Sequence, residues 1–123
     1  MNPIHGLVIT DDLLFASRIV ATGRAHQLTI TQIRNPVTFD HVNQLANVSA
    51  VFLDLQWIGA QLPSFVAKTR QANPKCRIVA YGSHVDLKSL ELARNCGCDV
   101  VLPRSSFAQQ VEEKLPEWLM PCA

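Results

Sequence analysis

The sequence of 123 residues predicts an α/β domain in which a five-stranded parallel sheet lies between two layers of helices. Short apolar, β-branched runs alternate with segments of helical spacing, the connections are short, and no repeat or linker interrupts them. Right-handed crossovers leave few arrangements of such units, and we expect the strand order 2-1-3-4-5. The length is typical of one core, so we expect a single domain over residues 1–123.

The first half of the chain supplies three strands and two helices. Its strand segments are short runs rich in apolar and β-branched residues, and the first two are followed by apolar residues at helical spacing. Gly23 allows the first helix to stop, and Asn35-Pro36 separates the second strand from the next helix. We expect strands at 6–10, 28–33 and 49–53, a helix at 13–23 with Leu13, Leu14, Ser17, Val20 and Ala21 at helical spacing, and a second helix that includes Phe39, Val42 and Leu45.

The second half continues the same alternation. Asn73-Pro74 ends one helix, and a turn at Gly82-Ser83 follows the next strand. Ser106, with Gln109 three residues later, is a capping-box pattern for the last helix, which we expect to finish near Pro116 and Pro121. We expect a helix at 61–72 with Leu62, Phe65, Val66 and Thr69 on one side, a strand at 76–81, a helix with Leu87, Leu90, Leu92 and Ala93 on its core side that ends near Gly97, a strand at 100–102, and a last helix with Phe107, Val111 and Leu115 facing inward.

Composition and charge exclude several classes of function. Apolar residues make up 48% of the chain, yet no apolar run approaches the length of a membrane span, so we expect no membrane contact. The net charge is +1 and the basic residues are scattered singly, which argues against direct binding of nucleic acid. No secretory signal is recognisable, so we expect a cytoplasmic location with reduced cysteines. The Cys-Gly-Cys spacing at 96–98 is too short for a zinc knuckle.

Acidic residues follow two of the predicted strands. Asp11 and Asp12 follow the first strand and Asp54 follows the third, and in this strand order these two strands are neighbours at the ligand crevice. Clustered carboxylates repel one another unless they share a cation or one of them is protonated, and oxygen ligands of this kind suit Mg²⁺ or Mn²⁺. A carboxylate beside such an ion can attack a phosphoryl group, and Arg104 is the candidate cation that offsets the developing charge.

Simpler interpretations of the same residues stay open. Asp11 and Asp12 can cap the first helix, Asp54 can bond a turn, Arg104 can be a solvated surface charge, and His84 can line a turn. The expected co-location of three acids favours a shared site over separate caps. The acidic segment after the first strand disfavours an FMN phosphate site, and the chain contains neither a dinucleotide fingerprint nor a P-loop.

Three segments resemble the receiver domains of bacterial two-component response regulators, and the resemblance spans nearly the whole chain. These segments are Ile-Thr-Asp-Asp at 9–12, Val-Phe-Leu-Asp-Leu at 51–55 and Gly-Cys-Asp-Val-Val-Leu-Pro-Arg at 97–104. The resemblance implies a flavodoxin-like (CheY-like) fold and a role in signal transduction rather than as an enzyme. In that family the acid that ends strand 3 accepts phosphate from a histidine kinase, and the strand 1 acids hold Mg²⁺.

The resemblance assigns roles to individual positions. The family's hydroxyl residue after strand 4 falls on Gly82, with Ser83 as its neighbour, and the family's lysine after strand 5 falls on Arg104. The partner face of the family is made by helix 4, strand 5 and helix 5. The implied set is Asp54 as phosphoacceptor; Asp11, Asp12, Asp54 and Gln56 for Mg²⁺; Gly82, Ser83 and Arg104 as phosphoryl-contacting residues; and Tyr81, Val101, Phe107 and Val111 near the partner face.

Three functions stay open at this point. The first is a stand-alone receiver-like domain that takes phosphate from a sensor histidine kinase or phosphotransfer protein and signals to a downstream protein by docking, with a homodimer also open. The second is a pseudo-receiver that docks without phosphorylation, because Gly82 and Arg104 depart from the family pattern and Trp57 could cover the acceptor. The third is a small metal-dependent phosphohydrolase that uses the same acids.

Overall fold

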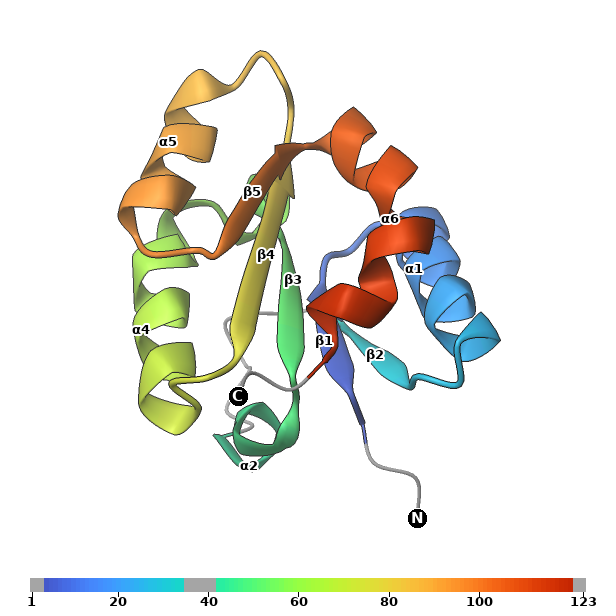
Figure 1. The fold of residues 1–123 in the computed structure, drawn as a ribbon. Helices are drawn as coiled ribbons and strands as arrows, with labels where there is room; N and C mark the ends of the chain where they lie inside the picture. The colour runs from blue at the N-terminus through green and yellow to red at the C-terminus, as the bar shows by residue number, and fades with distance from the viewer. Residues whose placement is uncertain (1–3, 35–41, 121–123) are drawn as a thin grey trace.

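The computed structural model describes residues 4–34 and 42–120, without the side chains of residues 42–44. Strands and helices alternate along the chain, and Figure 1 shows the sheet with helices on both of its faces. The strands are β1 (Gly6–Ile9), β2 (Ile30–Ile33), β3 (Ala50–Asp54), β4 (Arg77–Gly82) and β5 (Val100–Pro103). The helices are α1 (Leu13–Ala25), α2 (Val42–Asn47), α3 (Leu55–Ile58), the 3-10 helix η1 (Gly59–Gln61), α4 (Leu62–Ala72), α5 (Leu87–Asn95) and α6 (Arg104–Trp118).

The five strands are all parallel and lie in the order β2-β1-β3-β4-β5, which confirms the predicted fold class and strand order. Every residue of β1 and β3 is buried, as expected for central strands covered by helices on both faces. Ile9 lies opposite Leu53 in the β1–β3 pairing, and Asp54 lies opposite Tyr81 in the β3–β4 pairing. This register brings the chain after β1 beside the last residue of β3.

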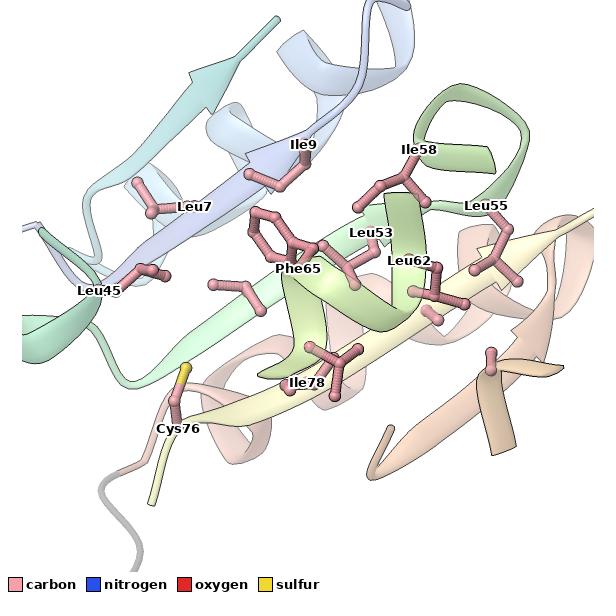
Figure 2. Close-up of a cluster of buried hydrophobic side chains, with 14 of the residues drawn as sticks. Leu7, Ile9, Leu45, Leu53, Leu55, Ile58, Leu62, Phe65, Cys76 and Ile78 are labelled. Atoms are coloured by element: carbon pink, nitrogen blue, oxygen red, sulfur yellow. The ribbon is translucent and has the colours of Figure 1, made fainter. Parts of the chain in front are cut away.

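Two apolar cores fill the spaces between the sheet and its helices. The first lies under α2, α4 and α5, and Figure 2 shows the aliphatic side chains of β1, β3 and β4 that pack there against Leu62 and Phe65. The second lies under α1 and α6 and contains aromatic rings. In it the ring of Phe107 stacks between the ring of Tyr81, at 4.6 Å between centroids, and the ring of Trp118, at 5.5 Å.

The inward face of α1 differs from the prediction. Leu13 and Leu14 are 53% and 86% exposed, whereas Ala16, Ile19 and Gly23 are buried. Gly23 lies inside the helix instead of ending it. It packs closely on the sheet, since a Cβ at this position would lie only 2.8 Å from the Ile30 side chain on β2. Ala16, Ile19 and Gly23 form the face of α1 that packs on the sheet, and the helix continues to Ala25.

The predicted inward residues of α4 are confirmed, and those of α5 are confirmed in part. Leu62, Phe65, Val66 and Thr69 are all buried. On α5 only Leu90 and Ala93 are buried, while Leu87, in the first turn, and Leu92 are exposed. The second predicted helix is present as α2, with Leu45 buried. The residues Asn35-Pro36, Phe39 and Pro121, for which the sequence also makes predictions, lie outside the described residues, as does the side chain of Val42.

The start and the end of α6 also differ from the prediction. The helix begins at Arg104, directly after Pro103 ends β5, so Ser106 lies within the first turn and does not cap it. At the other end the helix passes through Pro116 and continues to Trp118. Proline in a helix removes one backbone hydrogen bond. Burial of Leu115 and Trp118 on either side of Pro116 offsets that loss.

Candidate functional site at the carboxyl edge of the sheet

The three predicted acids line one cavity at the carboxyl edge of β1 and β3. This acidic cavity has a volume of about 260 Å³, and its lining residues are Asp11, Asp12, Asp54, Gln56, Trp57 and Arg104. Asp54 is the last residue of β3, and the two other acids follow β1. The strand register is therefore what brings residues 11 and 54 together across 43 positions of sequence.

Asp54 is buried, with 5% of its surface exposed, and both of its carboxylate oxygens accept hydrogen bonds. The Thr10 hydroxyl donates to Oδ2 at 2.7 Å. The backbone N–H groups of Gln56 and Trp57 donate to Oδ1 at 3.1 and 3.4 Å, so that Asp54 is the N-cap of α3. The sequence reading missed both α3 and the contribution of Thr10, although Thr10 stands directly before the acid pair.

Asp12 caps α1 and also binds Arg104. Its Oδ1 accepts a hydrogen bond from the Phe15 backbone N–H at 3.0 Å, and its Oδ2 accepts one from the Arg104 guanidinium. The hydrogen bond from the Phe15 N–H and then the Arg104 side chain hold the pKa of the Asp12 carboxyl below its usual range. Asp11 is exposed, and its side chain makes no hydrogen bond or ion pair with the residues that the structure describes.

Arg104 turns inward, toward the acids. It is the first residue of α6, it forms an ion pair with Asp12, and its guanidinium lies 4.4 Å from the centre of the Phe15 ring. A cation over an aromatic face is attracted by the ring quadrupole, so two contacts fix the position of this side chain. The alternative that Arg104 is merely a solvated surface charge does not describe this geometry.

A second cavity, of about 380 Å³, lies on the other side of Asp54. Its polar lining residues include Asp54, Ser83, His84 and Arg104, and Gly82 forms part of its wall. Ser83 is exposed, and its hydroxyl accepts a hydrogen bond from the Val85 N–H at 3.3 Å, a turn contact. Gly82 supplies no hydroxyl, and a Cβ at this position would lie 3.2 Å from the Leu55 side chain.

Tyr81 lies beneath this second cavity and carries an unpaired polar atom. The side chain is fully buried, and its hydroxyl has no hydrogen-bond partner within the described part of the chain. The Thr10 hydroxyl is near enough to lower the pKa of the Tyr81 hydroxyl somewhat, but the two groups do not reach hydrogen-bonding geometry. Burial, and next the negative charge of Asp54, raise the pKa of the Tyr81 hydroxyl.

The four residues assigned to a partner face do not share one surface. Tyr81, Phe107 and Val111 are buried in the core under α1 and α6, and Val101 is half-buried against the opposite core. They lie within the packing, so in this structure they present no common docking surface. Their burial agrees with the inward side predicted for Phe107 and Val111, and the placing of all four residues near a partner face stays a prediction.

Trp57 forms part of the wall of the acidic cavity. Its indole N–H donates to the Arg34 carbonyl at 2.7 Å, and the side chain is 38% exposed. The indole is therefore anchored toward the β2 side of the site.

The acids do not form a ready metal centre. Among residues 4–34 and 42–120 no three carboxylate, imidazole or thiol side chains are grouped so that they could hold a metal ion. The oxygens of Asp12 and Asp54 are already bonded to Arg104, Thr10 and backbone N–H groups. This arrangement does not fit a resident Mg²⁺ ion, and the Mg²⁺ assignment made from the sequence stays a prediction. Cys96 and Cys98 are free thiols, and Cys122 lies outside the described residues.

Comparison with solved structures places the fold among receiver domains. A protein from Burkholderia pseudomallei described as related to pilus assembly superposes with a TM-score of 0.76 at 15% identity, over 98% of this chain and 92% of that one. The signal receiver domain of a DNA-binding response regulator from Colwellia psychrerythraea gives 0.72 at 16% identity, over 93% and 98%. The receiver domain of NtrX from Brucella abortus gives 0.74 at 14% identity, over 93% and 97%.

No protein-family model and no curated protein sequence matches the chain. At these identities the structural neighbours establish a CheY-like fold and leave function to the site itself. Within the described residues no helix is both long and apolar enough to span a bilayer.

Proposed function

We propose that this chain is a receiver-like domain in two-component signal transduction and that it works by docking to a protein partner. The observation that carries the proposal is the position of Asp54 at the tip of β3, in one cavity with Asp11 and Asp12, on a receiver fold. The proposed partners are a sensor kinase or phosphotransfer protein and a downstream protein, and a homodimer is a further form to test. Because one neighbour in fold is described as related to pilus assembly, a component of such an assembly is a further candidate partner to test.

Asp54 is the proposed acceptor if the domain is phosphorylated. One carboxylate oxygen would attack the phosphorus of the donor, and the bond from phosphorus to the leaving group would break with its electron pair on that group. The Arg104 guanidinium, which lines both cavities beside Asp54, would offset the negative charge that develops.

The surroundings of Asp54 favour docking that does not require phosphate. Both carboxylate oxygens already accept hydrogen bonds, Gly82 offers no hydroxyl, and Arg104 is paired with Asp12. Each of these contacts would have to be given up or rearranged to hold a phosphoryl group. We therefore propose that the unphosphorylated protein, with these contacts in place, is the form that binds its partner.

Phosphorylation is tested by incubating the protein with acetyl phosphate and Mg²⁺ and measuring its intact mass. A gain of one phosphoryl group that Asp54→Asn abolishes supports an acceptor role. The matched control is Asp86→Asn, which changes the same residue type at another helix N-cap and should leave the gain intact. No gain in the wild-type protein rules out the acceptor role under these conditions.

Docking is tested separately by titrating the wild-type and Asp54→Asn proteins with phosphotransfer domains of sensor kinases in a calorimeter. We expect one domain of the panel to bind both proteins with the same affinity. Absence of binding to every domain, or binding only after phosphorylation, would contradict phosphate-independent docking to this class of partner.

No feature of the described residues favours the third candidate function, a metal-dependent phosphohydrolase.

A further inference from the structure

We propose that Arg104 is the resident cation of the acidic cavity and that it occupies the place a divalent metal ion would take. The domain then balances the charge of its carboxylates internally, and a metal ion can bind there only by displacing Arg104. This inference goes beyond the proposed function, because it concerns the charge balance of the site whether or not a partner docks or Asp54 is phosphorylated.

The first reason is the charge of the cavity lining. Three carboxylates line the acidic cavity, and Arg104 is the basic residue among the described residues that line it. Carboxylates that line one cavity repel one another, and a positive charge beside them offsets this repulsion. The guanidinium supplies this charge from within the chain.

The second reason is the cost of the position that Arg104 occupies. It is the first residue of α6, and the positive end of a helix dipole disfavours a cation there. The ion pair with Asp12 and the Phe15 ring face nevertheless hold the side chain inward. An arginine that had no partner at this position would gain by turning toward solvent, so the contact with Asp12 decides its orientation.

The third reason is that the carboxylate oxygens of Asp12 and Asp54 already accept hydrogen bonds. Asp12 Oδ2 accepts from Arg104 and Oδ1 from the Phe15 N–H, while Asp54 Oδ2 accepts from Thr10. Mg²⁺ demands a near-octahedral set of oxygens and loses its own waters reluctantly. Removing the guanidinium would free one oxygen of Asp12 and take one positive charge out of the cavity, and both changes favour a divalent cation.

The test is a titration with Mn²⁺, followed by calorimetry and by the electron paramagnetic resonance signal of the free ion. We expect the wild-type protein to bind Mn²⁺ weakly and Arg104→Gln to bind it about tenfold more tightly or better, the size expected for loss of one charge-assisted hydrogen bond. Arg104→Lys keeps the charge and should stay within a few-fold of the wild-type affinity.

The matched control is Arg94→Gln, which makes the same change of net charge on the exposed last turn of α5. It should bind Mn²⁺ as the wild-type protein does, and Asp12→Asn added to Arg104→Gln should remove the gain. Thermal unfolding of each variant shows whether it is folded. Equal affinities of the wild-type and Arg104→Gln proteins, whether both tight or both negligible, would overturn the proposal, as would an equal gain in Arg94→Gln. None of these outcomes depends on phosphorylation or on a partner.

Discussion

The Thr10 hydroxyl donates a 2.7 Å hydrogen bond to Asp54 Oδ2 and so joins the end of β1 to the tip of β3. The same hydroxyl oxygen accepts a hydrogen bond from the Asp12 N–H at 3.1 Å. Thr10 is fully buried, and its two hydrogen bonds hold Asp12 and Asp54 in place from the interior of the domain. Valine has the shape of threonine and would fill the same space, so the hydroxyl is the group that links the two strands.

Thr10→Val keeps the shape of the side chain and removes both hydrogen bonds. Because one acceptor is a buried carboxylate, we expect the free energy of unfolding to fall by about 1.5 to 3 kcal/mol in urea denaturation. Thr69→Val is the control, since the buried Thr69 hydroxyl donates only to the neutral Phe65 carbonyl of its own helix. Its loss should be roughly 1 kcal/mol or less. Equal losses in the two variants would show that the carboxylate bond has no special weight.

The lowered pKa of Asp12 predicts how stability changes in acid. A carboxyl whose pKa is lower in the folded state stabilises the protein above the pKa of the unfolded chain, and this contribution is lost as pH falls through the lower folded value. Urea unfolding between about pH 5 and pH 2 should therefore show the steepest loss of stability in the wild-type protein. Arg104→Gln should be less steep, because it keeps only the Phe15 cap, and Asp12→Asn least steep. Three parallel curves would contradict this assignment.

Tyr81 carries a buried hydroxyl that has no hydrogen-bond partner among the residues that the structure describes, so its removal should stabilise the protein. We expect Tyr81→Phe to raise the free energy of unfolding by about 1 kcal/mol near neutral pH. The raised pKa adds a second effect: the stability of the wild-type protein should fall as pH rises from about 10, the unfolded value, through the higher folded value. The variant should lack this alkaline loss. Tyr81 is the one tyrosine of the sequence, so the ultraviolet absorbance of ionised tyrosine follows it directly.

Arg70 ties together three segments at the amino edge of the sheet. Its guanidinium donates to the Cys76 carbonyl at 2.6 Å, the Gly97 carbonyl at 2.9 Å and the Asp99 carboxylate at 2.8 Å. Lysine has one compact charged group and cannot reach acceptors spread in this way. We expect Arg70→Lys to cost about 1 to 3 kcal/mol of unfolding free energy. Arg94→Lys, at an exposed position, should cost almost nothing, and an equal effect at both positions would contradict the role of Arg70.

The strands and their order were predictable because two-sided burial leaves a strong signal in the sequence. β1 is apolar throughout and β3 is apolar up to Asp54, which ends it, while Asp11 and Asp12 follow β1 after Thr10, so the meeting of these acids at one edge follows from the topology. Helical faces were less predictable. On α1 the leucines of the first turn are exposed, and the buried side consists of Ala16, Ile19 and Gly23, of which Gly23 lies close to Ile30 on β2.

The details of the site depended on side-chain directions that no sequence pattern specifies. The sequence identifies Arg104 as a candidate cation. That it pairs with Asp12 instead of Asp54 follows from its position at the start of α6 and from the nearby Phe15 ring. Thr10 was counted only as the end of a strand, since a threonine in an apolar run is typical of β structure. The inward direction of Phe107 follows from helical spacing, whereas its stacking on Tyr81 depends on how α6 packs on the sheet, which the sequence does not show.

The two tryptophans of the sequence lie at opposite ends of the sheet. Trp57 lines the acidic cavity, whereas Trp118 stacks on Phe107 near the other end of α6, where the Glu117 carbonyl accepts a hydrogen bond from Arg77 at the start of β4. The protein thus carries two intrinsic fluorophores in different surroundings, one half-exposed beside charges and one enclosed by aromatic rings. A pair of single-tryptophan variants would let emission spectra distinguish an event at the acids from a general loosening of the domain.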